Sequence, residues 1–239
     1  MAETGHAKQV ANFEVLVSYV TGYGGVYKPG NAMITLASLT AALAAAQAVI
    51  DGVTTGLIGW KVKVNDRETE YEGIGKFVNR LNAAFAASGA PTNAIEDMKG
   101  FARKVAGARK GKIKVDDPNT PENEATSNSV SQRSYTQVAE HFDAAIELAM
   151  NTPQFTPNEA EFAIAAMQAK SAAMKAANSA VIVTVTTLSN NRLDRNKILY
   201  TEVTSLYELA KLVKLYVISL YGKTSPQYKQ ISGLEFKKR

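Results

Sequence analysis

The sequence predicts an all-α protein made of two tandem, internally duplicated, antiparallel helical bundles. Two observations lead to this fold class. The chain matches itself when it is shifted by 128 residues, and self-similarity at a fixed period is typical of duplicated structural units. Apolar residues also recur every three or four positions through both copies, which is the period of an amphipathic helix. We therefore expect an N-terminal helical repeat over residues 1–110, a polar linker over 111–133, and a C-terminal repeat over 134–239.

Residue pairs at this spacing carry the repeat. Gln9-Val10-Ala11 matches Gln137-Val138-Ala139, and Asp66-Arg67 matches Asp194-Arg195. Three single pairs keep the same register: Pro29 with Pro157, Val53 with Val181, and Leu81 with Leu209. The linker contains DDPNTPENEATSNS, which consists of residues that favour turns and disorder. The match on both sides of such a linker indicates a duplication.

In the first copy we expect helices over residues 8–23, 30–61 and 66–88. The glycine-rich stretch TGYGGVYKPGN, residues 21–31, lacks both the G-x-x-x-x-G-K-[ST] and the G-x-G-x-x-G spacing of phosphate-binding loops. The end of one helix followed by a proline that starts the next explains it, so we interpret it as a connection. Asn65 with Glu68 predicts the start of the third helix.

In the second copy we expect helices over residues 134–151, 157–188 and 192–221, with a short element after them. Thr156 and Glu159 around Pro157 form a capping-box pattern, and Asn191 with Asp194 predicts the next start. The β-branched segments 57–64 and 180–188 are expected to be helical, because Val181, Val185 and Leu188 continue the face of the alanine-rich segment before them. The last helix carries an apolar seam: Leu199, Val203, Leu206, Ala210, Val213, Val217 and Leu220.

The composition excludes several classes of functional site. The chain has 239 residues, 46% hydrophobic and 21% charged, which is typical of a soluble globular protein. It has no cysteine, so disulfides, thiolate metal sites and cysteine nucleophiles are excluded. The start MAETGHAKQV lacks a signal-peptide pattern, and we expect a cytoplasmic protein. The uncharged residues 29–50 correspond to charged residues 157–178, which argues against a membrane span.

Candidate catalytic and metal-binding residues are few. Glu3 and His6 have the E-x-x-H spacing of di-iron bundles, but the second motif that such a site needs is missing. His141 lies near Asp143 and Glu147 and corresponds to Phe13, so we interpret it as a packed histidine rather than a general base. We expect no metal, no cofactor and no enzymatic activity.

Two charged pairs occupy matching positions in the copies, Asp66-Arg67 and Asp194-Arg195. Such arginines could form bidentate ion pairs that hold the copies together. They could alternatively clamp an anion between the copies. We favour the ion pairs.

The net charge of +5 is concentrated in a few segments. Basic residues beside tyrosines can bind single-stranded nucleic acid or another acidic partner. More often such segments are solvated linkers and tails, or tyrosines packed at a core rim. The candidate contacts are Arg103, Lys104, Arg109, Lys110, Lys211, Lys214, Lys237 and Lys238.

The C-terminal residues 216–238 contain Tyr221-Gly222, Ser225-Pro226-Gln227-Tyr228-Lys229 and Gly233-Leu234-Glu235-Phe236. This ending resembles that of a family of uncharacterised bacterial helical proteins. The resemblance implies a helical fold and no particular activity. Its residues predict a helix stop at Gly222, a new turn capped by Ser225, and a tail that folds back over the end of the bundle.

We therefore expect a structural or scaffold protein that assembles with itself or binds another protein. Binding of nucleic acid is the alternative. The alanine-rich helix of the first copy has no counterpart of the same composition in the second, which favours a role as the assembly face. The residues predicted to form that face are Leu36, Leu39, Leu43, Val49 and Ile50.

Overall fold

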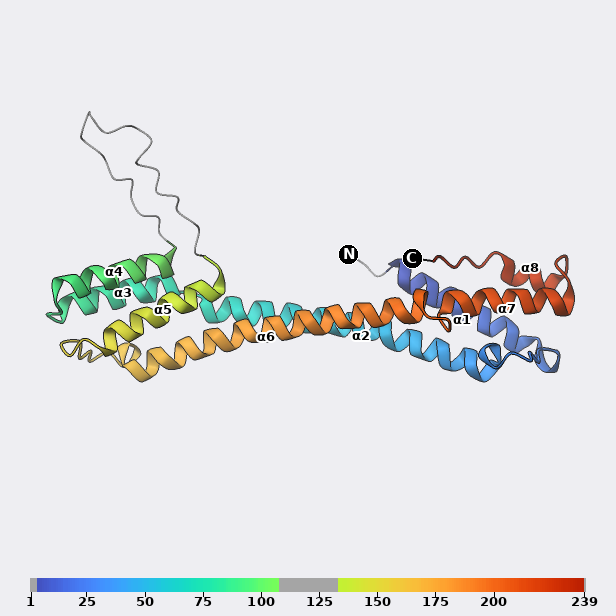
Figure 1. Cartoon of the computed structure of the whole chain (residues 1–239), viewed down its shortest axis with the longest axis horizontal. Coiled ribbons are helices and arrows are strands. Elements are labelled where there is room, and N and C mark those ends of the chain that lie inside the picture. Colours follow the sequence, from blue (N-terminus) through green and yellow to red (C-terminus); the bar gives the residue numbers. More distant parts are fainter. Residues whose placement is uncertain (1–3, 108–132, 239) are drawn as a thin grey trace, which may run out of the picture. The chain divides into compact units, whose positions relative to one another are not determined.

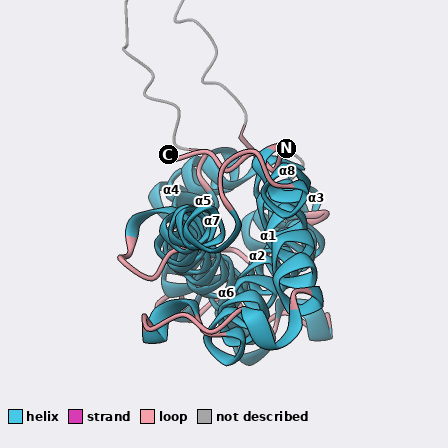
Figure 2. Cartoon of the chain, turned by 90° about the vertical axis from the view of Figure 1, so that its right-hand side faces the viewer, coloured by secondary structure: helices cyan, strands magenta, loops and turns pink. Residues whose placement is uncertain are grey.

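The computed structural model describes residues 4–107 and 133–238. Within these residues every regular element is helical and there is no strand (Figure 2), which confirms the all-α class. The helices, labelled in Figure 1, are α1 (Thr4–Gly22), α2 (Leu36–Tyr71), α3 (Ile74–Ala87), α4 (Thr92–Ala106), α5 (Tyr135–Met150), α6 (Ile164–Asn196), α7 (Leu206–Tyr221) and α8 (Pro226–Ser232). Short turns, η1 (Gly24–Val26), η2 (Ala32–Ile34), η3 (Ala160–Phe162) and η4 (Lys197–Thr201), stand between them.

The predicted breaks inside the two long helices are wrong. α2 continues through Asn65 to Tyr71, and α6 continues through Asn191 to Asn196. A polar residue caps a helix only where the preceding backbone leaves the helical conformation. In α2 that happens at Gly73, whose φ of +73° is a conformation that other residues rarely adopt. The β-branched segments 57–64 and 180–188 lie within α2 and α6 and are helical, as expected.

The predicted starts of these helices are also too early. Pro157 lies in a connection without regular structure, and α6 begins only at Ile164. The 3₁₀ turn η3 lies between them and buries Phe162. Likewise η2 buries Ile34 before α2 begins. A turn with a buried apolar residue therefore lies between Pro29 and α2 and between Pro157 and α6.

Serine caps fix the starts of the shorter helices. The Ser225 side chain accepts a hydrogen bond from the Tyr228 amide, and Pro226 is the first residue of α8, as predicted. Gly222 ends α7 with a φ of +85°. In α7 the predicted seam is buried at Leu206, Ala210, Val213 and Val217 and half-buried at Leu220, but Val203 lies before the helix and is 75% exposed. The Ser205 cap starts α7 after that residue and so excludes it.

The chain forms two compact units. We call residues 1–61 and 183–239 the terminal unit and residues 62–182 the central unit. In the terminal unit α1 packs against α7 and α8, and in the central unit α4 packs between α3 and α5. Each unit thus combines helices from both predicted repeats. The predicted linker 111–133 lies almost wholly outside the described residues.

Buried positions recur along the chain at nearly constant spacing. In α1 and α5 the matching positions are 129 residues apart: Val10, Phe13, Leu16, Val17 and Val20 with Ala139, Phe142, Ala145, Ile146 and Ala149. In α2 and α6 the spacing is 128: Leu39, Ala46 and Val53 with Met167, Met174 and Val181. In α3 and α7 it is 132: Ile74, Val78, Leu81 and Phe85 with Leu206, Ala210, Val213 and Val217. The match of Phe13 to His141 was therefore one residue off, because Phe142 is the buried residue.

Candidate functional site

A cleft of about 520 Å³ opens in the terminal unit between the start of α2 and the π turn η4. π turns occur frequently at functional sites. Glu202 is the only ionisable residue in the lining, and the other side chains are mainly apolar. The lining comprises Ala32, Met33, Ser38, Ala41, Ala42, Ala45, Ile198, Glu202, Thr204, Leu206 and Leu209. Such a surface suits apolar contacts better than acid–base chemistry, which typically uses paired titratable groups.

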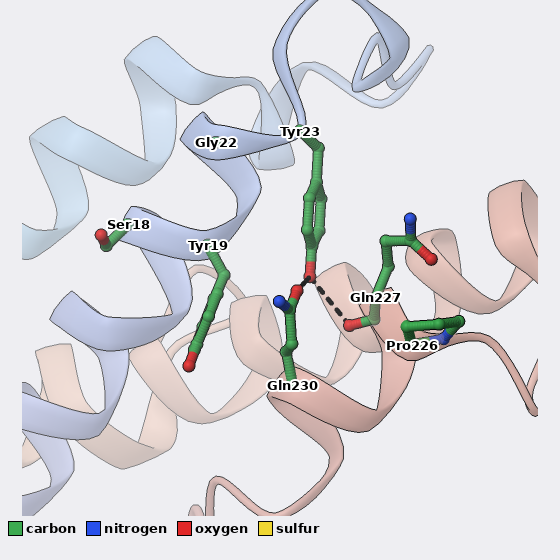
Figure 3. Close-up of a pocket in the computed structure, with 7 residues that line it drawn as sticks. All are labelled: Ser18, Tyr19, Gly22, Tyr23, Pro226, Gln227 and Gln230. Atoms are coloured by element: carbon green, nitrogen blue, oxygen red, sulfur yellow. Dashed lines mark hydrogen bonds between the residues drawn. The ribbon is translucent and has the colours of Figure 1, made fainter.

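A smaller pocket of about 290 Å³ lies between α1 and α8 in the same unit (Figure 3). The Tyr23 hydroxyl points into it and lies 2.8 Å from the carbonyl oxygen of Gln227 and 3.3 Å from Oε1 of Gln230. Burial raises the pKa of Tyr23, and the neighbouring Tyr221 and Tyr19 raise it further. The hydroxyl therefore stays protonated at neutral pH and acts as a hydrogen-bond donor that ties α1 to α8.

The two arginines predicted as ion pairs or an anion clamp have different surroundings. Arg67 lies in the central unit, where its guanidinium carbon is 4.0 Å from the centre of the Tyr135 ring, a cation–π contact. Its Nε is buried without a hydrogen-bond partner among the described residues. Arg195 lies in the terminal unit and is buried, and it donates to the side-chain oxygen of Asn196.

The matching aspartates pair with lysines on their own helices. Asp66 accepts from Lys63 over 2.7 Å, and Asp194 lies 3.4 Å from Lys197. Both pairs are exposed, so they contribute little to stability. The described contacts of both aspartates are with lysine, which precedes Asp66 in α2 and follows Asp194 at η4.

The predicted assembly face is largely part of the core. Leu39 is fully buried in the terminal unit, and Leu36, Leu43 and Ile50 pack against the same core. Val49 is half-buried. Helical spacing explains the result, because residues three, four and seven positions apart share the face that the core already covers. The exposed positions of this segment are small or polar: Ala37, Thr40, Ala41, Ala44, Ala45, Gln47 and Ala48.

The predicted contacts for an acidic partner are divided between the units. Arg103 and Lys104 lie in the last turn of α4, and the Lys104 ammonium is 5.9 Å from the Phe101 ring. Lys211 pairs with Glu208 over 3.8 Å. Lys214 donates to backbone carbonyls of the C-terminal segment.

The remaining predicted contacts lie near the C-terminus or outside the described residues. Lys238 lies 6.0 Å from the Tyr207 ring, and the Lys237 backbone amide donates to Gln9. Arg109 and Lys110 lie outside the described residues.

Neither histidine lies in a metal-binding cluster of the described residues. His6 is buried, with Nδ1 2.6 Å from the Tyr200 hydroxyl, while Glu3 lies outside the described residues. His141 is half-buried, and its neighbour Asp143 pairs with Lys175 and accepts from Ser171. Burial lowers the pKa of His141, Lys104 lowers it further, and Glu140 raises it by less.

Sequence reasoning missed an exposed apolar surface on the long helices. In the terminal unit Ile58 is 58% exposed, Val183 63%, Val185 44% and Leu193 57%. The signal was present in AVIVTVTTL: consecutive apolar residues on a helix point in different directions, so one packed face cannot bury them all.

One helical stretch of the described residues, Leu36–Ala87, is long and apolar enough to cross a membrane, judged by length and composition alone. Only 17% of its most apolar window is buried. The sequence matches no family model and no curated protein, and no solved structure matches the chain.

Proposed function

We propose that this chain is a non-enzymatic helical scaffold that assembles with copies of itself through the exposed apolar side chains of α2 and α6 in the terminal unit. The observation that carries this proposal is the exposure of Ile58, Val183, Val185 and Leu193 on two helices of one unit. Exposed apolar side chains are candidates for contacts with a partner, and these four come from two helices of the same unit.

The partner that we propose is a second copy. Both α2 and α6 use their remaining apolar faces inside the unit: Val53 and Leu188 are buried, and the Asn191 amide donates to the carbonyl oxygen of Gly52 over 2.8 Å. Beyond this packed seam Ile58, Val183, Val185 and Leu193 remain exposed. A second copy presents the same β-branched surface, and self-complementary patches are the basis of symmetric assemblies.

We also infer that the chain arose as a tandem duplication of one helical bundle unit. The spacing of the buried residues supports this inference, because buried positions recur between α1 and α5, between α2 and α6, and between α3 and α7. The turns η2 and η3, and the starts of α2 and α6, are each 128 residues apart as well.

A charge placed in the exposed surface tests the assembly. Val183→Glu combined with Val185→Glu should weaken association at least tenfold, because a carboxylate buried without a partner costs several kcal/mol. The matched control is Val203→Glu, which adds a charge at an exposed apolar residue outside α2 and α6. Molar mass from light scattering after size exclusion, at low and at physiological salt, provides the measurement. A monomer of 25.7 kDa at all concentrations and both salts would overturn the proposal.

A further inference from the structure

The C-terminal strap, residues 233–238, follows α8 and has no regular secondary structure. Side chains of α1 and α7 hold most of its length, and the Leu234 amide also donates to the carbonyl oxygen of Ile231 at the end of α8. The strap therefore lies on the helices as an extended peptide ligand would, with the difference that it is part of the same chain.

Side chains of α1 and α7 form hydrogen bonds with the backbone of the strap and with the residue that precedes it. Lys214 Nζ donates to the carbonyl oxygens of Leu234 over 2.6 Å and of Ser232 over 3.2 Å. Asn12 Nδ2 donates to the carbonyl oxygen of Glu235 over 2.8 Å. The backbone amide of Lys237 donates to Oε1 of Gln9 over 3.1 Å. Hydrogen bonds to the main chain provide affinity for an extended segment.

We call the surface of α1 and α7 that the strap covers, with Gln9, Asn12, Phe13 and Lys214, the groove. Two of its side chains are held in position by contacts of their own. Gln9 is 4% exposed, and its Nε2 donates to the carbonyl oxygen of Leu199 over 3.2 Å. That bond directs Oε1 of the same amide toward the strap. Lys214 is held between two carbonyl oxygens and an aromatic ring, and burial lowers its pKa.

Two side chains of the strap supply its specificity. Phe236 packs edge-on against the fully buried Phe13, with ring centres 6.3 Å apart, and Lys214 Nζ lies 5.6 Å from the centre of the Phe236 ring. Leu234 packs against the core of the terminal unit beside it. Glu235, between them, is exposed. The groove therefore reads a Leu-x-Phe pattern in an extended backbone.

We propose that the groove between α1 and α7 is a recognition site for an extended Leu-x-Phe segment, and that the strap of a second copy can occupy it. The segment seated in the groove identifies the ligand, since every copy carries the same strap. A tethered strap competes at an effective concentration of about a millimolar, so exchange between copies becomes favourable when copies are held close together. This site is separate from the α2–α6 surface, and its test does not depend on the proposed assembly.

Peptide binding to the full chain tests the site. Leu234→Ala with Phe236→Ala loosens the strap while leaving the groove intact, and the probe is a fluorescent peptide Gly-Leu-Glu-Phe-Lys-Lys. We expect saturable binding to this variant and at least tenfold weaker binding to the unaltered chain. A control peptide with alanine in place of phenylalanine should bind at least tenfold more weakly. Asn12→Ala in the same variant should weaken binding by about threefold to tenfold, the effect of one lost hydrogen bond.

Circular dichroism and a cooperative thermal transition establish that the variant is folded. A folded variant that does not bind the peptide at concentrations up to about a millimolar overturns the recognition site.

Exchange between copies is tested in the full chain, whose lack of cysteine allows single engineered thiols. One copy carries Asn12→Cys and the other Lys237→Cys, and a short bismaleimide links thiols that lie close together. We expect mixed cross-linked dimers well above the yield of a control pair, Glu140→Cys with Lys237→Cys, in which the first thiol lies on exposed α5 surface of the central unit. Equal yields from the two pairs overturn the exchange.

Discussion

Asn178 donates a hydrogen bond from its side-chain amide to the hydroxyl of Tyr71, over a distance of 2.7 Å. The same hydroxyl donates to the carbonyl oxygen of Tyr135 over 2.8 Å. One phenolic oxygen therefore joins α2, α5 and α6 inside the central unit. Burial raises the pKa of Tyr71, so the proton that it donates is retained at neutral pH.

Removing this hydroxyl should destabilise the protein. Tyr71→Phe leaves the Asn178 amide and the Tyr135 carbonyl without their shared partner, and we expect a loss of about 1–2 kcal/mol in the free energy of unfolding. Urea denaturation followed by circular dichroism measures it. Tyr19→Phe, at an exposed tyrosine, is the matched control and should change stability by less than about 0.5 kcal/mol. Equal effects of the two changes would contradict the role of the Tyr71 hydroxyl.

Two glycines of α2 provide a matched pair for testing how closely the helices approach. A Cβ atom at Gly56 would lie 2.9 Å from the Asn191 side-chain nitrogen and 3.6 Å from the Leu188 backbone, whereas one at Gly59 would have no atom within 4 Å. Gly56→Leu should therefore destabilise the protein by about 1–3 kcal/mol through overpacking. Gly59→Leu should stabilise it by up to about 1 kcal/mol, because leucine is the better helix former. Thermal unfolding of both variants measures these changes. An increase in stability in both variants would exclude close packing at Gly56.

The burial pattern makes a prediction about three residues of α1 and α5. Phe13 and Phe142, which are 129 residues apart, are both fully buried, while His141 is half-buried. Phe13→Ala and Phe142→Ala should each cost about 3–5 kcal/mol. His141→Ala should cost less than either. If the loss of stability in His141→Ala instead equalled that in Phe13→Ala, residues 128 positions apart would correspond in α1 and α5.

His141 should also make stability depend on pH. Burial and Lys104 lower its pKa below 6.5, the ordinary value of a histidine, so the unfolded chain binds a proton more readily than the folded chain. Its contribution to stability is present above about pH 6.5 and is lost as the pH falls toward the folded pKa. We expect the urea midpoint to fall between about pH 7.5 and pH 5, and to fall less in His141→Gln. An identical decline in both proteins would assign the effect to other groups.

Local signals in the sequence predicted local features correctly. The Ser225-Pro226 start of α8, the stop at Gly222 and the connecting role of residues 21–31 depend on neighbours within a few positions. Sequence patterns also identified the helical class, since the apolar period of a helix is a property of each segment by itself.

Features set by distant contacts were missed. Asn65 and Asn191 had the chemistry of caps, but the helices around them continue because no residue there forces the backbone out of the helical conformation. Leu39 was expected on a surface, and only the packing of α2 against α1 and α7 residues in one core shows that it is interior. The site residues Gln9, Asn12 and Lys214 are more than 200 positions apart at their extremes, and no spacing rule links them.

The composition of the terminal unit has a consequence for biosynthesis. Its residues 1–61 leave the ribosome first, but the residues 183–239 that complete it emerge only after the whole central unit has been made. At roughly 5–20 residues per second, the earliest helices wait on the order of ten seconds for α7 and α8. During that interval the uncovered apolar positions of α1 and α2 are available to chaperones or to neighbouring nascent chains. We therefore expect the central unit, which is continuous in sequence, to acquire its structure first during translation.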